Sequence, residues 1–415
     1  MKTILDVSLL GQGFYHQKAR TGVFRVAENL ATLLPTISPD LEILFADNLD
    51  LTATLGYVNE HLKKQNSKFV NPDSQVSFAE LQSKILAAFP LNSIPQKVIK
   101  KIFYRFHSSN ISYQDDLLAD ASLYHSPYFP IPNQIQERKK LKKLITIHDL
   151  IPIKYPHFFE NRTDNVVHQI VSSLQPDTFV VCVSEATKVD LLEISGLSDS
   201  QVFVVPLAAS KELFYPVLDR ELIAQILLKY SIAADKPYFL SISTLEPRKN
   251  IDTVIKSFAE MVSQEKVNDL QLVLVGTKGW DFEKIFEAIN VSPSIKNRII
   301  VTGYVPDEDL AALYSGALSF VYVSHCEGFG LPPLEAMQCG TPVITSNTTS
   351  LPEVVGNAGI LVSPLDREEI SQAMLDLYQN SSLITSLKLK SIQQAKTFSW
   401  EKFAQETWNV YQNIV

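Results

Sequence analysis

Residues Phe320–Thr345 read FVYVSHCEGFGLPPLEAMQCGTPVIT and carry the clearest architectural signal in the chain. The stretch opens with one continuous apolar run, Phe320–Val323, and closes with another, Val343–Thr345. Between them lie a glycine-rich loop and a helical segment. Paired prolines suit the start of that helix, and Gly340 suits its end. A strand, a loop, a helix and a second strand in this order predict one unit of a parallel sheet.

The same alternation of short apolar runs and helical patterns extends outward in both directions. Continuous apolar strands are typical of parallel sheets covered by helices on both faces. A helix with apolar spacing over Val23–Leu33 is expected to stop at Pro35. Two blocks of strand–helix alternation predict two doubly wound α/β domains. The other predicted strands are Ile4–Leu10, Leu41–Ala46, Leu144–Ile147, Phe179–Val183, Val202–Val205, Tyr238–Ile242, Leu272–Val275, Ile299–Val301 and Gly359–Val362.

The segment Pro206–Pro237, which begins and ends with a proline, marks the expected boundary between the two domains. We expect an N-terminal domain over 1–207, a linker over 208–236 and a C-terminal domain over 237–398. A last helix, 399–415, begins at Ser399 as N-cap and carries several large aromatic residues. It needs a broad apolar surface, which either its own domain or the N-terminal domain could supply.

Composition excludes several classes of protein. The 415 residues carry a net charge of −8, which argues against a nucleic-acid binder. Three cysteines without a Cys-x-x-Cys pair support neither a disulfide framework nor a structural zinc site. We see no signal peptide, and no run approaches the roughly 18 apolar residues of a membrane span. The expected location is the cytoplasm, with or without contact to the inner face of the membrane.

Two stretches of the first block are locally basic. Residues 97–106 mix cations with large apolar side chains, and residues 138–143 read RKKLKK. Either stretch could be an ordinary solvated surface. The sharper interpretation is a patch for anionic lipid or for a lipid-phosphate acceptor, because basic amphipathic helices lie in membrane interfaces.

The glycine-rich loop has the chemistry of an anion site. It follows a buried strand, and ligands of open α/β sheets bind at the carboxyl ends of strands. Gly328 and Gly330 allow close approach of a ligand, and the following helix N-terminus attracts phosphate. Glu327 and Glu335 flank this site and suit sugar or ribose hydroxyls on either side of a diphosphate. The alternative is a tight turn with two solvated glutamates.

A second segment weakens that alternative. Arg248 and Lys249 follow the predicted strand Tyr238–Ile242, and could neutralise a diphosphate. The structural alternative is an exposed first turn of a helix, but cations there oppose the helix dipole. His325 and Cys326 beside Glu327 have no further ligand at a suitable spacing, so no metal site is predicted.

These segments resemble the retaining glycosyltransferases of family four, also called group 1, and most closely their bacterial mannosyl- and rhamnosyl-type members. Glu327 and Glu335 match the E-x7-E motif of that family. The resemblance covers nearly the whole chain and is weaker across residues 50–120. The other matching segments are Thr21–Arg25, His148–Leu150, Val183–Thr187, Leu245–Asn250, Leu274–Gly276, Thr302–Val305 and Ser350–Gly356.

The resemblance implies the GT-B fold, in which two doubly wound Rossmann-like domains face each other across a cleft. It also implies a role for each matching residue. The implied catalytic residues are Glu327, His148, Arg248 and Lys249, with Glu327 and His148 beside the donor sugar and the two cations on the diphosphate. Those implied to bind the donor are Glu335 at the ribose, Gly328, Phe329, Gly330 and Leu331 at the sugar and phosphate, Gly276, Tyr304 and Val305 near the base, and Gly22 and Ser243. Many members carry Gly-Arg where this chain has Ser243-Thr244.

The implied reaction moves a hexose from a nucleotide-diphosphate sugar, with GDP-mannose favoured, to a saccharide or a lipid-linked acceptor. Retention of configuration is implied by the family. No Asp-x-Asp looks like a metal site, so we expect no metal and no cofactor besides the nucleotide sugar. Closure of the domains should exclude water. The alternatives are a nucleotide-sugar epimerase or hydrolase of the same fold, or an inactive nucleotide-sugar-binding module.

Overall fold

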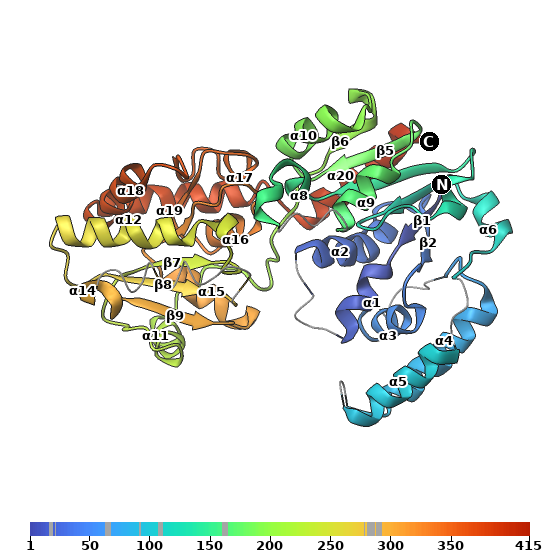
Figure 1. The fold of residues 1–415 in the computed structure, drawn as a ribbon, viewed down its shortest axis with the longest axis horizontal. Helices are drawn as coiled ribbons and strands as arrows, with labels where there is room; N and C mark the ends of the chain where they lie inside the picture. Colours follow the sequence, from blue (N-terminus) through green and yellow to red (C-terminus); the bar gives the residue numbers. More distant parts are fainter. Residues whose placement is uncertain are drawn as a thin grey trace.

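The computed structural model describes residues 1–15, 20, 22–62, 68–90, 93–106, 111–159, 165–277, 279, 287 and 293–415. These residues form two halves that lie side by side, with the chain passing from one half to the other after β6 (Figure 1). Each half contains one six-stranded sheet in which all strands are parallel.

The N-terminal sheet has the strand order β2-β1-β3-β4-β5-β6. Its strand order reverses between β1 and β3, which creates a crevice at their carboxyl ends. Its strands are β1 (Lys2–Asp6), β2 (Glu42–Ala46), β3 (Leu123–Ser126), β4 (Lys142–Ile147), β5 (Thr178–Cys182) and β6 (Val202–Val204).

The C-terminal sheet has the order β12-β11-β10-β7-β8-β9, and its strand order reverses between β7 and β10. The two segments that carry the predicted anion-site residues follow these two strands. The strands are β7 (Tyr238–Ile242), β8 (Gln271–Val275), β9 (Ile299–Gly303), β10 (Ser319–Tyr322), β11 (Val343–Ser346) and β12 (Ile360–Val362).

Helices flank both sheets and supply the apolar faces that bury them. Those of the N-terminal half are α1 (Ser8–Tyr15), α2 (Gly22–Ile37), α3 (Leu51–His61), α4 (Asp73–Ala87), α5 (Ile94–Phe106), α6 (Asp115–Asp120), α7 (Asn133–Gln136), α8 (Ile151–Lys154), α9 (Val166–Ser173) and α10 (Glu185–Ser195). Those that follow are α11 (Arg220–Lys229), α12 (Ile251–Gln264), α14 (Pro293–Lys296), α15 (Asp307–Gly316), α16 (Leu331–Gln338), α17 (Leu351–Val355), α18 (Arg367–Gln379), α19 (Ser381–Ala395) and α20 (Trp400–Ile414). Short 3₁₀ turns η2 (Pro156–Phe158), η3 (Asp199–Gln201) and η4 (Pro247–Lys249) complete the elements.

Three details of the predicted secondary structure were wrong. The predicted strand Ile4–Leu10 ends at Asp6, whose carboxylate accepts the Ser8 N–H at 2.9 Å and turns the chain into α1. Strand β3 was not predicted, because its sequence LYHS is half polar. Helix α2 continues through Pro35 to Ile37, because a proline in the last turn removes only one hydrogen bond of the helix.

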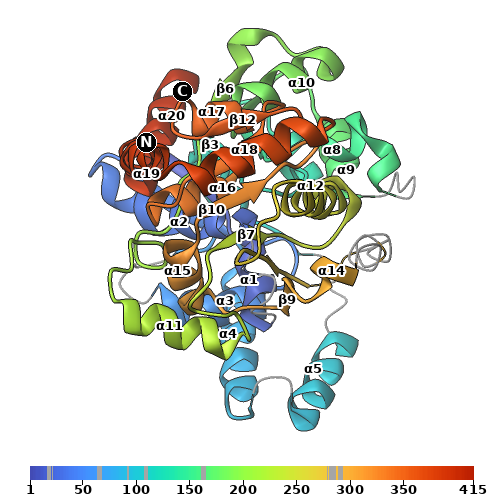
Figure 2. The same ribbon diagram turned by 90° about the vertical axis from the view of Figure 1, so that its left-hand side faces the viewer.

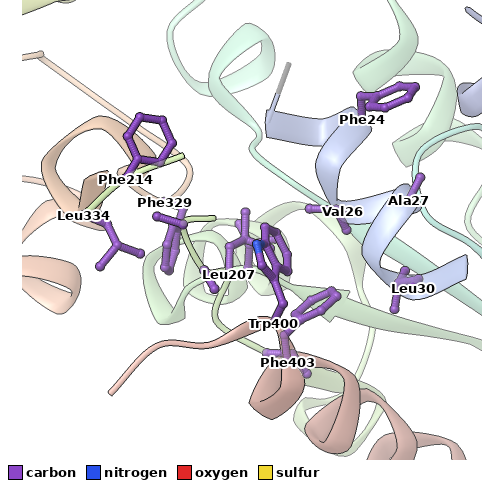
Figure 3. Close-up of a cluster of buried hydrophobic side chains, with 14 of the residues drawn as sticks. Phe24, Val26, Ala27, Leu30, Leu207, Phe214, Phe329, Leu334, Trp400 and Phe403 are labelled. Atoms are coloured by element: carbon purple, nitrogen blue, oxygen red, sulfur yellow. The ribbon is translucent and has the colours of Figure 1, made fainter. Parts of the chain in front are cut away.

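One buried apolar cluster is continuous across the junction of the two halves. Figure 3 shows residues of α2, the connecting segment, the glycine-rich loop, α16 and α20 in one group. Phe24 and Leu30 come from α2, Leu207 from the connection, and Phe329 and Trp400 from the C-terminal part of the chain. The continuous core fixes how the two sheets face each other.

The last helix lies against the N-terminal half. Ser399 caps α20 by accepting the Lys402 N–H at 3.1 Å, and α20 packs along α2. At the far end, the Tyr411 hydroxyl hydrogen-bonds His125 Nδ1 at 2.7 Å. His125 Nε2 lies 2.8 Å from the Thr146 hydroxyl, so this interior histidine is paired at both nitrogens.

Candidate active site

A cavity of about 450 Å³ opens between the two halves, at the carboxyl ends of β7 and β10. Ten of the predicted site residues line it. They are Gly22, His148, Arg248, Lys249, Glu327, Gly328, Phe329, Gly330, Leu331 and Glu335, and the further lining residues are Arg20, Val23, Arg25, Asp149, Val183, Leu207, Tyr322 and Pro332.

Glu327 is the centre of a buried ion cluster on the C-terminal wall of the cavity. Its Oε1 accepts from Lys249 Nζ at 2.6 Å and from the Tyr322 hydroxyl at 2.8 Å, and its Oε2 lies 2.9 Å from Arg248 Nη1. Burial by itself would raise the pKa of Glu327, but Lys249 and Arg248 lower the pKa to about 2. Glu327 is therefore a carboxylate at any physiological pH.

The turn after β7 sets the two cations in place. Arg248 and Lys249 form η4, and Asn250 follows with φ 58° in the left-handed region. The Asn250 side-chain amide donates to the Val323 carbonyl at 3.0 Å and to the Pro364 carbonyl at 2.7 Å. This ties the start of α12 to the end of β10. The Arg248 and Lys249 side chains are only 14% and 12% exposed, which excludes the exposed helix turn considered above.

Arg248 is already partly engaged. Its Nη2 donates to Glu246 at 2.8 Å, and its Nη1 to the Cys326 carbonyl at 2.8 Å. Its buried Nε–H has no hydrogen-bond partner among the described residues. A buried donor without a partner costs stability, so this N–H is a candidate contact for an anionic ligand.

The glycine-rich loop lines the cavity and leaves several of its backbone donors unpaired within the described part of the chain. The buried Ser350 hydroxyl lies 2.6 Å from the Phe329 carbonyl and 2.9 Å from that of Glu327. The N–H groups of Gly328, Phe329 and Gly330 make no hydrogen bond to any described residue. Gly330 has φ 132°, and helix α16 starts directly after it. Amide donors at a helix N-terminus favour a negatively charged group.

Glu335 differs from Glu327 in where its partner comes from. It is buried in α16, and its Oε1 accepts from Arg25 Nη1 of the N-terminal half at 3.2 Å. The Tyr314 hydroxyl donates to its other oxygen at 3.2 Å. Burial raises the pKa of Glu335, and Arg25 only partly opposes this. Arg25 also bonds Asp307, the first residue of α15, at 2.7 Å.

His148 forms the opposite wall together with the first turn of α2. Its Nε2 donates to the Pro127 carbonyl at 2.8 Å, so its neutral ring carries no proton on Nδ1. Burial lowers the pKa of His148 to about 4, and the ring is neutral near pH 7. A Cβ atom on Gly22 would lie 2.6 Å from a Leu331 methyl group, so the two walls touch here.

Four residues that were predicted to bind the donor lie outside the lining of the cavity. They are Gly276, Tyr304, Val305 and Ser243. A Cβ on Gly276 would lie 1.7 Å from the Ser243 carbonyl, so these two residues pack backbone to backbone. Val305 is buried beside Tyr304, which is 53% exposed. The structure brings Gly276 and Ser243 together at the carboxyl ends of β8 and β7, next to the cavity but not in its wall.

Sequence reasoning missed eight of the lining residues, and the polar ones among them are Arg20, Arg25, Asp149 and Tyr322. Arg25 and Asp149 lie in segments that match the family, but no role was predicted for them. Tyr322 lies in a predicted strand that was described only as apolar. Thr21, the first residue of the motif with Arg25, lies outside the described residues. A cation in the first turn of a helix, against the dipole, was the available signal for Arg25.

Within the described ranges, no group of three or more His, Cys, Asp and Glu side chains could hold a metal ion. The cavity thus combines cations, the acidic side chains of Asp149, Glu327 and Glu335, and backbone amides at the point where the C-terminal strand order reverses. That arrangement defines a class of enzyme that binds an anionic, hydroxyl-rich ligand between two Rossmann-like domains.

Comparison with known proteins identifies the family. The sequence profile described as "Glycosyl transferases group 1" matches residues 224–397. O-antigen chain mannosyltransferase B of Escherichia coli is 34% identical over 290 residues, which cover 70% of this chain and 74% of that protein. Serotype-specific mannosyltransferase WbdA of Escherichia coli is 28% identical over 63% of this chain, but this match spans only 32% of WbdA.

The fold is likewise shared with solved structures. Anabaena Alr3699/HepE in complex with UDP and glucose superposes with a TM-score of 0.64 at 15% identity, and the alignment covers 99% of both chains. The architecture is that of the GT-B glycosyltransferases, as expected. The chain belongs to the group 1 glycosyltransferases and is a glycosyltransferase.

Proposed function

We propose that this enzyme transfers mannose from GDP-mannose to a saccharide or lipid-linked acceptor, with retention of configuration and without a metal ion. The observation that carries the proposal is the buried Arg248–Lys249–Glu327 cluster beside the unpaired amides of the glycine-rich loop. Mannose is supported by the names of the two E. coli relatives, both mannosyltransferases. The UDP bound by Anabaena Alr3699/HepE makes uracil the first rival base.

Charge development favours this arrangement for the departure of a nucleoside diphosphate. As the glycosidic bond breaks, negative charge grows on the β-phosphate. Lys249, the Arg248 Nε–H and the amides at the start of α16 would stabilise that charge where it forms. In this proposal they take the place that a divalent cation has in other transferases.

Glu327 is proposed to position the sugar and not to attack it. Three donors already hold its two oxygens, and its pKa of about 2 makes it a poor proton donor. Glu335 would accept the ribose hydroxyls, and neutral His148 would contact the donor sugar from the opposite wall. A front-face route, in which the departing phosphate takes the proton of the acceptor hydroxyl, then accounts for retention. An inverted anomeric product would contradict this mechanism.

A thermal-shift panel tests the donor. GDP, GDP-mannose, UDP, UDP-glucose and dTDP-rhamnose are added with and without EDTA, because a ligand of the native state raises the melting midpoint. We expect the guanine nucleotides to raise it, EDTA to change nothing, and Glu335→Ala to abolish the shift. Release of free mannose without any acceptor would favour a hydrolase. No shift with any nucleotide would overturn the donor assignment.

We further propose that the α4–α5 hairpin contacts the membrane surface that carries the acceptor. Both helices project from the N-terminal half (Figures 1 and 2). Leu81 of α4 is 54% exposed, and Ile94 and Val98 of α5 are 79% and 53% exposed. Exposed Lys97 and Lys101 lie on the same helix as Ile94 and Val98, which suits anionic lipid.

The second basic stretch exposes Lys139, Lys140 and Lys142, but its apolar residue Leu141 is buried, so it does not offer the same amphipathic surface. Lys143 is buried and pairs with Asp177 at 2.6 Å, and Arg138 pairs with Asp115. Within the described residues, no helix is long and apolar enough to cross a membrane. Co-sedimentation with phosphatidylglycerol vesicles is expected to fall when Ile94 and Val98 are changed to Ser, and to persist when Leu389, an exposed leucine of α19, is changed to Ser.

A further inference from the structure

The carbonyl of Gly328 is held by the domain opposite to its own. The Ser184 hydroxyl donates to it at 2.6 Å, and the Thr187 hydroxyl lies 3.2 Å from it. Ser184 is also the N-cap of α10, where its oxygen accepts the Thr187 N–H at 3.1 Å. The Ser184 hydroxyl therefore caps the start of a helix in the N-terminal half and also holds the glycine-rich loop of the C-terminal half.

A second contact crosses the junction at the same helix. Glu353 of α17 accepts the N–H groups of Glu185 and Ala186, each at 2.8 Å. These are among the first N–H groups of α10, which have no partner within the helix. A carboxylate there also faces the positive end of the helix dipole. The C-terminal half thus supplies the cap of an N-terminal helix, while that helix supplies a clamp in return.

The fit between the walls leaves no room beside Gly328. A Cβ atom at this position would lie 1.9 Å from the His148 carbonyl and 2.7 Å from the Asp149 Cβ. Only a glycine can lie between Ser184 and His148 when the two halves meet. The conformation of the loop that presents the donor amides therefore depends on contact with the other half.

We propose that Ser184, Thr187 and Glu353 form a closure latch that positions the glycine-rich loop, so that the donor site is complete only when the domains are closed. The three are positioning residues, since they act through the backbone of Gly328 and the start of α10. Opening of the latch frees the loop carbonyl and removes the Glu353 carboxylate from the first N–H groups of α10 in the same motion. This inference does not depend on which sugar or base the enzyme uses.

The distance between the two halves tests the latch without any substrate. Spin labels are attached to cysteines introduced at the exposed residues Ser200 and Ser386, and the distance distribution is measured by pulsed electron spin resonance. The three native cysteines are buried, which limits background labelling. Wild-type protein is expected to show the closed distance as its main population.

The variant Ser184→Ala/Thr187→Val removes both hydroxyls and is expected to raise the open-to-closed ratio about tenfold, because each hydrogen bond contributes modestly to stability. Gly328→Ala, which forces a Cβ against the His148 carbonyl, should open the domains as well. Ser184→Thr/Thr187→Ser keeps both hydroxyls and should restore the closed distance. Asn380→Ala removes the cap of α19 within the C-terminal half and should not change the distance.

An unchanged distance distribution in both Ser184→Ala/Thr187→Val and Gly328→Ala overturns the latch. So does an opening of equal size in Asn380→Ala, because that would reflect general loss of stability. GDP binding, measured by calorimetry on the same proteins, separates the two proposals. If GDP fails to bind the wild type while the distances respond, the donor assignment fails and the latch stands.

Discussion

The two walls of the cavity are assembled in different ways. On the C-terminal wall, Arg248, Lys249, Tyr322 and Glu327 all belong to one half and contact one another directly. On the N-terminal wall, the contacts that matter reach across the junction, as from Arg25 to Glu335.

The two glutamates of one motif show what this difference means. Glu327 has two cations from its own half, and its pKa is lowered to about 2. Glu335 has one cation, from the other half, and burial raises its pKa. The ion cluster around Glu327 is therefore built within one half, whereas the glycine-rich loop and the ribose side of the site depend on how the two halves meet.

A substitution in the ion cluster of the C-terminal wall should reduce the rate of transfer more than any other change considered. Lys249→Met removes a cation that we place on the leaving phosphate and leaves Glu327 with one cation fewer. We expect kcat for mannosyl transfer to fall by roughly 10²–10³, the range for loss of one transition-state donor. The matched control is Lys256→Met, because Lys256 forms an exposed ion pair with Asp252. A decrease below threefold in Lys249→Met would exclude Lys249 from the reaction.

Breaking the contact between the walls should have a smaller effect that grows in acid. Arg25→Gln removes the only cation within 4 Å of Glu335 among the described residues, so the already raised pKa of Glu335 rises further. The donor KM should increase about tenfold at pH 7, the size of one charged hydrogen bond, and more at pH 6. Arg220→Gln, at the exposed start of α11, is the control. A KM ratio independent of pH would contradict a role through Glu335.

The packing of α20 on the N-terminal half also contributes to the contact between the two halves, and its contribution to stability can be measured. Tyr411→Phe leaves buried His125 without its Nδ1 partner. An unpaired buried polar group costs about 1–3 kcal/mol, so the free energy of unfolding in urea should fall by that amount. Tyr378→Phe, which loses an exposed bond to Asp269, should cost less than about 0.5 kcal/mol.

Two buried histidines of the N-terminal half should each destabilise the fold in mild acid. Burial lowers the pKa of His125 to about 3 and that of His148 to about 4, from 6.5 when unfolded. The unfolded chain thus binds protons that the folded chain does not, and stability is lost as pH falls from about 6.5 toward these values. Between pH 7 and pH 6 the two histidines together should cost about 1 kcal/mol, whereas Asp47, whose pKa burial raises to about 7, gains a proton in the folded state and opposes this loss.

Glu327 contributes later, because its stabilisation is lost only between pH 4.5 and about 2. Urea titrations at pH 7, 6, 5, 4 and 3 measure the order of these losses. Titration of either imidazole near pH 6.5 in the folded protein, followed by NMR, would contradict the contribution of the two histidines.

The sequence by itself determined the features that depend on local chemistry. Apolar runs gave eleven of the strands approximately, since strands buried on both faces must be apolar, and the E-x7-E loop gave the family. Glu327, Gly328 and Gly330 could be located because loop, glycine and helix start are adjacent in the chain. The half-polar strand β3 could not be predicted from its sequence, because its His125 can be buried only when Tyr411 and Thr146 pair with it.

Only the tertiary structure decided which residues meet across the junction. Nothing local in the segment around Arg25 shows that it will contact a glutamate 310 positions away, nor that Ser184 will hold the Gly328 carbonyl. Such pairings arise from how two sheets and α20 pack around one continuous core, and hydrogen bonds at that distance in sequence leave no pattern in either segment. The local sequence thus determines which chemical groups each wall of the cavity carries, and the packing of the two domains determines which of these groups meet.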